Sequence, residues 1–323
     1  MNIKKIGLTA LAGSLVATSA FAGEMSVSGG ASISLEHING GAADNGKSFT
    51  MGNQLTFSGS GELDNGLNVS LSFILDQNDD KAADDQVTAG NYNAGSPFDS
   101  HSVTVSSDAL GSLTFYGEGG SSSMSARDTS AAGDIWDAYD AEDGHEPNTV
   151  GTGDNMMKYT LPSLMDGLSV DASYYPGREG KDTAIGYGAT YTGVEGLTVN
   201  YATGDDSSVG NVNDASVLSA SYAYGPVTVS YSDFEYDAQT DSADDEMEAY
   251  KISYTVSDEL SVSYGSEEIT TNSTTAEYER ISASYTAGGM TITATFDEAT
   301  DRNGTTTATM DNERWALGAS FAF

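Results

Sequence analysis

The feature that most constrains this 323-residue chain is a period-two alternation of apolar and polar residues, which begins near Gly23 and continues to the end. It is clear in the segments 25–36, 67–75, 168–174 and 290–296. Successive side chains of a β-strand point to opposite faces, so each segment has one apolar and one polar face. No long window has helical periodicity with caps. The pattern predicts an all-β protein.

The composition indicates where the apolar faces point. Hydrophobic residues make up 38 % of the chain and are spread over its whole length, while the polar faces consist mostly of Ser, Thr and Gly. A soluble sandwich needs enough apolar surface for a dry interior, whereas a closed cylinder in lipid needs only an apolar outer face around a wet lumen. No run of about 18 apolar residues occurs in the body of the chain, which excludes a transmembrane helix there. We therefore expect a transmembrane β-barrel.

The connections between these segments alternate between two kinds. Short connections with turn-forming residues lie at 64–66, 109–111, 165–167, 194–196, 224–226, 257–259 and 287–289. Long, polar and mostly acidic connections lie around 39–47, 77–98, 119–155, 177–183, 204–214, 237–246, 269–275 and 299–310. Seven short and eight long connections predict sixteen strands. Both termini then lie on the side of the short turns, which is the periplasmic side of outer-membrane barrels.

Charge and cysteine content exclude several functions. The chain has 48 acidic and 12 basic residues, with a formal net charge of −36, so we expect no nucleic-acid partner because phosphates would be repelled. It has no cysteine, and therefore no disulfide, thiolate metal site or cysteine nucleophile.

The first 22 residues have the pattern of a secretory signal peptide. Lys4 and Lys5 precede an apolar stretch, and the segment 20–22 reads Ala-Phe-Ala, the small-residue pattern at which such peptides are cleaved. Cleavage after Ala22 leaves residues 23–323 as a single barrel domain. We therefore expect an exported protein.

Aromatic residues mark the strand ends and the end of the chain. Many tyrosines lie on the apolar phase near strand ends, as in aromatic girdles at the lipid–water boundary. Residues 314–323 alternate perfectly and finish on Phe323. With the export signal, the sixteen strands and the very long third loop, this resembles the general porins of Gram-negative bacteria, above all the alphaproteobacterial branch. The resemblance implies an antiparallel up-and-down barrel in the outer-membrane lipid, a homotrimer and a water-filled channel for ions and small hydrophilic solutes.

The third long loop, at 119–155, is the candidate for narrowing that channel. A barrel of this strand number leaves an aqueous lumen, and the resemblance implies that this loop folds into it. Ile135, Trp136 and Tyr139 are its candidate anchors to the inner wall. The predicted acidic side of the constriction comprises Asp128, Asp134, Asp137, Asp140, Glu142, Asp143 and Glu146. The alternative is an ordinary solvated outer loop.

The resemblance also implies a row of bases on the opposite wall, and this sequence departs from it. The inward phase offers only Lys158, Lys251, Arg280 and Arg314 as the basic side, while the early strands carry acids. An acid-dominated constriction concentrates cations and excludes anions. The sequence therefore predicts a cation-preferring channel without strict selectivity.

Other functions find less support. A solute-specific channel on the same barrel needs an aromatic or charged ladder, and the inward phase is mostly Ser, Thr and Gly. A surface structural protein or adhesin has no need of alternating short and long connections. We expect no enzyme, because the three histidines, His37, His101 and His145, are scattered and none are paired at metal-binding spacing. No cofactor is expected. The acids between Asp137 and Glu146 are oxygen ligands of the kind calcium prefers but lack EF-hand spacing, so bound calcium and unliganded acids both remain open.

Overall fold

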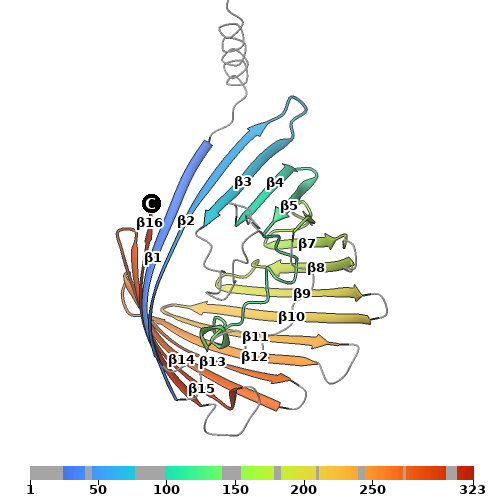
Figure 1. Cartoon of the computed structure of the whole chain (residues 1–323). Coiled ribbons are helices and arrows are strands. Elements are labelled where there is room, and N and C mark those ends of the chain that lie inside the picture. The colour runs from blue at the N-terminus through green and yellow to red at the C-terminus, as the bar shows by residue number, and fades with distance from the viewer. Residues whose placement is uncertain are drawn as a thin grey trace, which may run out of the picture.

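The computed structural model describes residues 25–40, 46–76, 99–139, 154–177, 183–208, 211–238, 244–271, 274–302 and 311–323. Within these residues the chain forms sixteen β-strands and one short 3-10 helix (Figure 1). The strands are β1 (Met25–Gly40), β2 (Gly46–Glu62), β3 (Asn68–Asp76), β4 (Ser100–Ser107), β5 (Gly111–Glu118), β6 (Met156–Thr160), β7 (Leu168–Tyr175), β8 (Thr183–Tyr191), β9 (Leu197–Ser208), β10 (Asn211–Tyr224), β11 (Val227–Asp237), β12 (Asp245–Thr255), β13 (Leu260–Thr271), β14 (Thr274–Ala287), β15 (Met290–Thr300) and β16 (Asn312–Ala322). The 3-10 helix η1 (Trp136–Tyr139) lies between β5 and β6.

Each strand pairs antiparallel with its neighbours in sequence, and β1 pairs with β16 to close the barrel. The predicted sixteen-stranded up-and-down barrel is therefore confirmed. Closure leaves no sheet edge, so backbone groups along the strands are hydrogen-bonded within the wall, as a hydrocarbon surrounding requires. The terminal Phe323 completes the seam, because its backbone exchanges two hydrogen bonds of 2.8 and 3.0 Å with Gly29.

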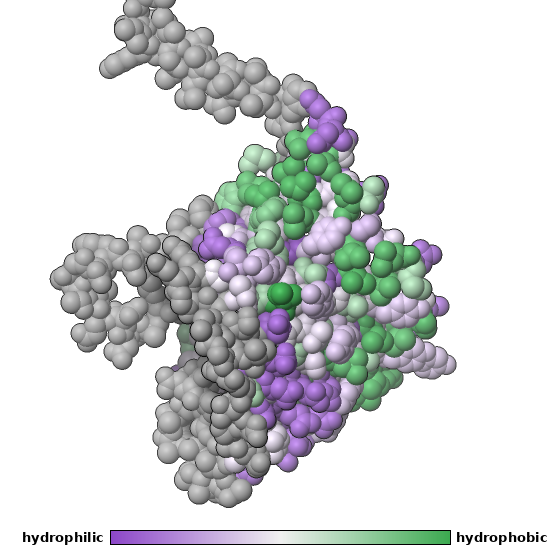
Figure 2. All heavy atoms as spheres, turned by 90° about the vertical axis from the view of Figure 1, so that its right-hand side faces the viewer, coloured by the Kyte–Doolittle hydropathy of each residue, from purple (hydrophilic) through white to green (hydrophobic). Residues whose placement is uncertain are grey.

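The alternation places the apolar side chains on the outside of the barrel. On β13, Val262 and Tyr264 point outward with the apolar phase, while Gly265 and Glu267 are buried on the inner side. Figure 2 shows hydrophobic side chains over the upper part and the right-hand side of the visible face, and a hydrophilic group at its lower centre. None of the described helices is long and apolar enough to cross a membrane. The apolar wall is made by strands.

Several strands extend further than the sequence predicted. The long connections expected at 204–214 and 269–275 lie largely in strands, since β9 and β10 pair as far as Ser208 and Asn211, and β13 and β14 as far as Thr271 and Thr274. The prediction followed apolar residues, whereas backbone pairing continues where the side chains are polar or acidic.

The register of the later strands places like charges opposite one another on the outer face. Exposed glutamates form five cross-strand pairs on β11–β16, which we call the outer carboxylate band. The pairs are Glu235 with Glu246, Glu248 with Glu268, Glu268 with Glu277, Glu279 with Glu298, and Glu298 with Glu313. Like charges directly opposite in a sheet are destabilising.

The described part of the third loop lies inside the barrel, seen in green in Figure 1, which confirms the predicted infolding. Residues 119–139 of this segment are called the constriction loop below. Three side chains of this loop are fully buried against the wall: Met124, Ile135 and Tyr139 have no exposed surface. The core therefore sits between loop and wall, and the apolar anchoring predicted for Ile135 and Tyr139 is present.

Glycines on the inner wall make room for the loop. A Cβ on Gly188 of β8 would lie 2.3 Å from Nη1 of Arg127, and one on Gly265 of β13 would lie 3.0 Å from Cβ of Ala132. Gly204 of β9 lies beneath Met124 in the same way. The inner wall therefore carries a shallow trough in which the loop backbone lies close to the strands.

Candidate pore constriction

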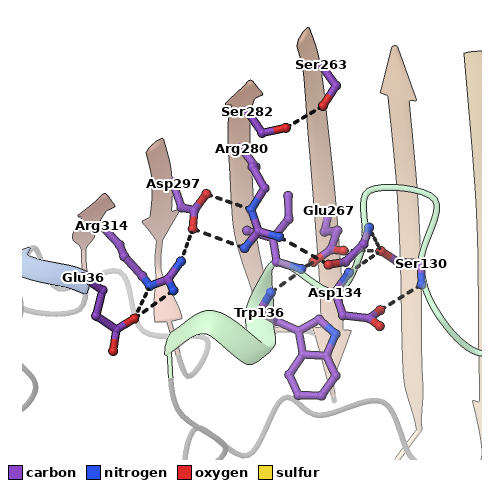
Figure 3. A network of polar contacts seen from close by, with 12 residues as sticks. Glu36, Ser130, Asp134, Trp136, Ser263, Glu267, Arg280, Ser282, Asp297 and Arg314 are labelled. Carbon is purple, nitrogen blue, oxygen red and sulfur yellow. Dashed lines mark hydrogen bonds and ion pairs between the residues drawn. The ribbon is translucent and has the colours of Figure 1, made fainter. Parts of the chain in front are cut away.

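One buried carboxylate holds the tip of the constriction loop. Glu267 on β13 has no exposed surface, and its Oε2 accepts hydrogen bonds from the backbone N–H of Ile135 at 2.6 Å and of Trp136 at 3.1 Å. Its Oε1 accepts the hydroxyl of Ser130 (Figure 3). The Oγ of Ser130 itself accepts the N–H groups of Gly133 at 2.9 Å and Asp134 at 3.0 Å. Glu267 thus ties together both ends of the turn that enters η1.

Further hydrogen bonds tie the loop to other strands. Nearer its start, the N–H of Ser123 donates to Oγ of Ser173 on β7 at 2.9 Å. Further along, the N–H of Ala131 donates to Oγ of Ser232 on β11 at 2.8 Å. The guanidinium of Arg127 makes a two-pronged contact with Asp171 on β7. The loop therefore follows the inner wall from β7 to β13.

Two arginines and two acids alternate along the wall beside the loop tip. Nε of Arg280 lies 2.8 Å from Oδ1 of Asp297, and Nη1 of Arg314 lies 2.7 Å from Oδ2 of the same carboxylate. Nη2 of Arg314 lies 2.8 Å from Oε2 of Glu36. Figure 3 shows the four side chains in one continuous network across β14, β15, β16 and β1. Each arginine is held in a fixed direction by a carboxylate that offsets its charge.

The loop acids face this network across a cavity of about 720 Å³. Glu36, Asp134, Asp137, Arg280 and Arg314 all line it. Lys47 also lines it, so the lining holds three acids and three bases in all, and fully buried Asp297 adds one more negative charge behind the arginines. The local balance is therefore slightly negative, and Arg280 reaches the loop itself, since its Nη1 donates to the backbone oxygen of Gly133 at 3.3 Å.

The environment of the loop acids changes their protonation. Burial, reinforced by the charge of Asp134, raises the pKa of Asp128 to about 6. Burial also raises the pKa of Asp134, with a smaller contribution from Asp137. Because desolvation penalises the charged form of a carboxyl group, both acids take up protons more readily than acids in water.

The structure brings four of the predicted site residues together and separates others. Asp134, Asp137, Arg280 and Arg314 share the cavity, with Asp128 behind them in the loop. Lys251 lies in the same cross-strand row as the two arginines but does not line this cavity. Lys158 lies on β6, in a separate recess. Four predicted acids fall outside the described residues: Asp140, Glu142, Asp143 and Glu146.

Sequence reasoning missed Lys47 at the start of β2, which lines the cavity although the early strands were expected to carry only acids, and two buried acids that build the site. Glu267 and Asp297 are both on the inward phase, so the alternation placed them in the lumen, but nothing in it showed that one holds the loop and the other joins the arginines. The calcium question concerns a segment mostly outside the described residues. Among the described residues there is no group of three or more side chains suited to hold a metal ion.

Comparison with known proteins identifies the family. A family model for Gram-negative porins matches residues 7–278. The chain belongs to the Gram-negative porin family. No curated protein sequence matches it significantly.

Solved porin structures share the fold at low sequence identity. A triple mutant of the Rhodopseudomonas blastica porin superposes with a TM-score of 0.65 and 14 % identity, covering 93 % of this chain and 100 % of that one. A second mutant of that porin gives a TM-score of 0.66 and 14 % identity over the same shares. OmpT of Vibrio cholerae with loop L8 deleted gives 0.64 and 16 %, covering 93 % and 99 %. The family and the barrel place this porin in the outer membrane.

Proposed function

We propose that this porin is a general channel through which ions and small hydrophilic solutes diffuse passively, with a preference for cations. The observation that best supports this proposal is the cavity between loop and wall, which is lined by Asp134 and Asp137 of the loop and by Arg280 and Arg314 of the wall. An opening lined by charged side chains of both signs admits hydrated solutes and disfavours apolar ones. No bond is made or broken in this function, and no cofactor takes part.

The sign of the preference follows from the local charges. Both arginines are offset by Asp297 and Glu36, whereas no base is hydrogen-bonded to Asp137 among the described residues. The uncompensated charge at the opening is therefore negative, which raises the local cation concentration. Screening over about 8 Å at physiological salt keeps the preference moderate.

The proposal includes export and assembly. Cleavage of the signal peptide after Ala22 releases the mature chain. Assembly as a homotrimer is supported by the outer wall, because ten exposed tyrosines lie on β6–β14 and no described residue on the outer face of β1–β5 is Tyr or Trp. Tyrosine favours the lipid–water boundary. We assign β1–β5, where Phe57 and Phe73 stack at 4.9 Å, as the face covered by other copies.

Reversal-potential measurements on purified protein in planar bilayers test the preference. In a KCl gradient we expect the dilute side to become positive, because potassium crosses more readily than chloride. A negative dilute side would refute cation preference, and the absence of any channel would refute the pore itself. Unheated protein should migrate as a trimer in detergent gels. A solute-specific channel, the second candidate, is favoured if one solute class alone blocks the current saturably.

A further inference from the structure

A second polar recess lies in the lumen, under the first part of the constriction loop. Its volume is about 310 Å³, at the lower end of ligand-binding cavities. Arg127 and Thr129 of the loop form one side, and Lys158 of β6 and Asp171 of β7 form the other. This recess shares no lining residue with the cavity at Arg280 and is built by β6–β10 instead of β14–β16 and β1.

An ordered hydrogen-bond chain forms its floor. Nη2 of Arg127 donates to Oγ1 of Thr190 at 3.2 Å, and that hydroxyl donates to Oδ1 of Asn200 at 2.8 Å. Nδ2 of Asn200 in turn donates to Oγ of Ser219 at 3.1 Å. Each group is oriented by the one before it, so the floor presents donors and acceptors in fixed directions across β8, β9 and β10.

Arg127 and Asp171 compensate each other, but Lys158 has no such partner. The side chain of Arg127 is only 9 % exposed and that of Asp171 7 %, so this pair is a sealed part of the wall. The ammonium of Lys158 lies 5.8 Å from the ring centre of Tyr116 and has no carboxylate partner among the described residues. It leaves the recess with one net positive charge and three N–H donors for a bound solute.

We propose that this recess is a weak binding subsite for small hydroxylated monocarboxylates. The carboxylate of the solute pairs with the Lys158 ammonium, and its hydroxyls exchange hydrogen bonds with the side chains of Thr160, Asn200 and Ser219. The acids of the nearby loop, Asp128 and Asp134, disfavour solutes with more than one negative charge. The subsite rests on the proposed channel function and adds to it a local affinity for one class of anion in a cation-preferring pore.

Gluconate is a suitable probe, with glucose as the uncharged control and Lys251→Gln as the matched variant. Lys251 is also an inward lysine on the wall, but it lies on β12, outside the recess. We expect potassium gluconate to reduce the bilayer current of the unmodified porin saturably, and glucose to act more weakly. In Lys158→Gln the half-saturating gluconate concentration should rise about threefold or more, as for loss of a partly exposed charge pair. Lys251→Gln should behave like the unmodified porin.

Three outcomes would overturn the subsite. The first is a reduction of the current by gluconate that never saturates. The second is a half-saturating gluconate concentration that is unchanged in Lys158→Gln. The third is an equal rise of that concentration in Lys251→Gln, which would indicate only the general electrostatic field of the lumen. Both variants must show the heat-dependent gel mobility of a closed barrel, and the gluconate effect is expressed relative to the KCl current of each variant. If the unmodified porin conducts KCl and gluconate has no saturable effect, the subsite fails while the channel function stands.

Discussion

Replacing Glu267 by Gln should release the tip of the constriction loop without unfolding the barrel. Glutamine can still accept the two backbone N–H groups of Ile135 and Trp136 on its one carbonyl oxygen. Its amide nitrogen, however, must then face Ser130 as a donor, and both lone pairs of that hydroxyl are already taken by the N–H groups of Gly133 and Asp134. At least one charge-assisted hydrogen bond is lost, which costs about 1.5–3 kcal/mol. The ratio of docked to undocked loop falls by about 10- to 100-fold.

Single-channel recording measures this change directly. We expect the Glu267→Gln channel to show more current noise, a larger mean conductance and a weaker cation preference, since Asp134 leaves the opening with the loop. Glu268→Gln is the matched control, because the neighbouring acid is exposed on the outer face and its loss removes the same charge. Heat-dependent gel mobility checks that both barrels are closed. Current traces of Glu267→Gln identical to those of the unmodified porin, or an equal change in Glu268→Gln, would refute the reasoning.

Since the pKa of Asp128 is raised to about 6, the loop loses a negative charge as pH falls through that value. Reversal potentials should therefore show a weaker cation preference at about pH 5 than at about pH 8. A cation-to-anion permeability ratio that is the same at both pH values would contradict this. Gly188→Ala should raise current noise because the added Cβ displaces the Arg127 guanidinium, whereas Gly46→Ala, with no atom within 4 Å, should not. Glu298→Gln, in the outer carboxylate band, should raise the melting temperature at low salt because it removes two like-charge pairs. The rise in melting temperature should be smaller at high salt, where the repulsion is screened. An equal rise at low and high salt would argue against an electrostatic cause.

The period-two alternation predicted most of the fold, because each residue of a barrel strand faces either the lipid or the water of the lumen. It placed Arg280 in the lumen and Tyr285 on the outer face, and the structure agrees. It failed at the strand ends, since pairing at Thr271 and Thr274 depends on backbone hydrogen bonds that polar side chains do not prevent. Strand number was therefore predictable, while strand length was not.

The site was predictable only as a set of residues facing the lumen. Glu267 is about 130 residues from the loop atoms it binds, and nothing in its local pattern differs from that of a solvated inward acid. Asp297 likewise became a partner of two arginines only through the register of three strands. Which inward groups meet is a property of the closed barrel, and one sequence carries no direct signal of it.

The glycine trough has a consequence for biogenesis. Its floor comes from β8, β9 and β13, and the strongest hold on the loop tip comes from β13, so the loop has nowhere to settle until the later part of the chain has joined the wall. The constriction is accordingly complete only when β13 is in place. A chain that ended before β13 would lack the Glu267 carboxylate, and the tip of its constriction loop would have no docking partner at that point of the wall.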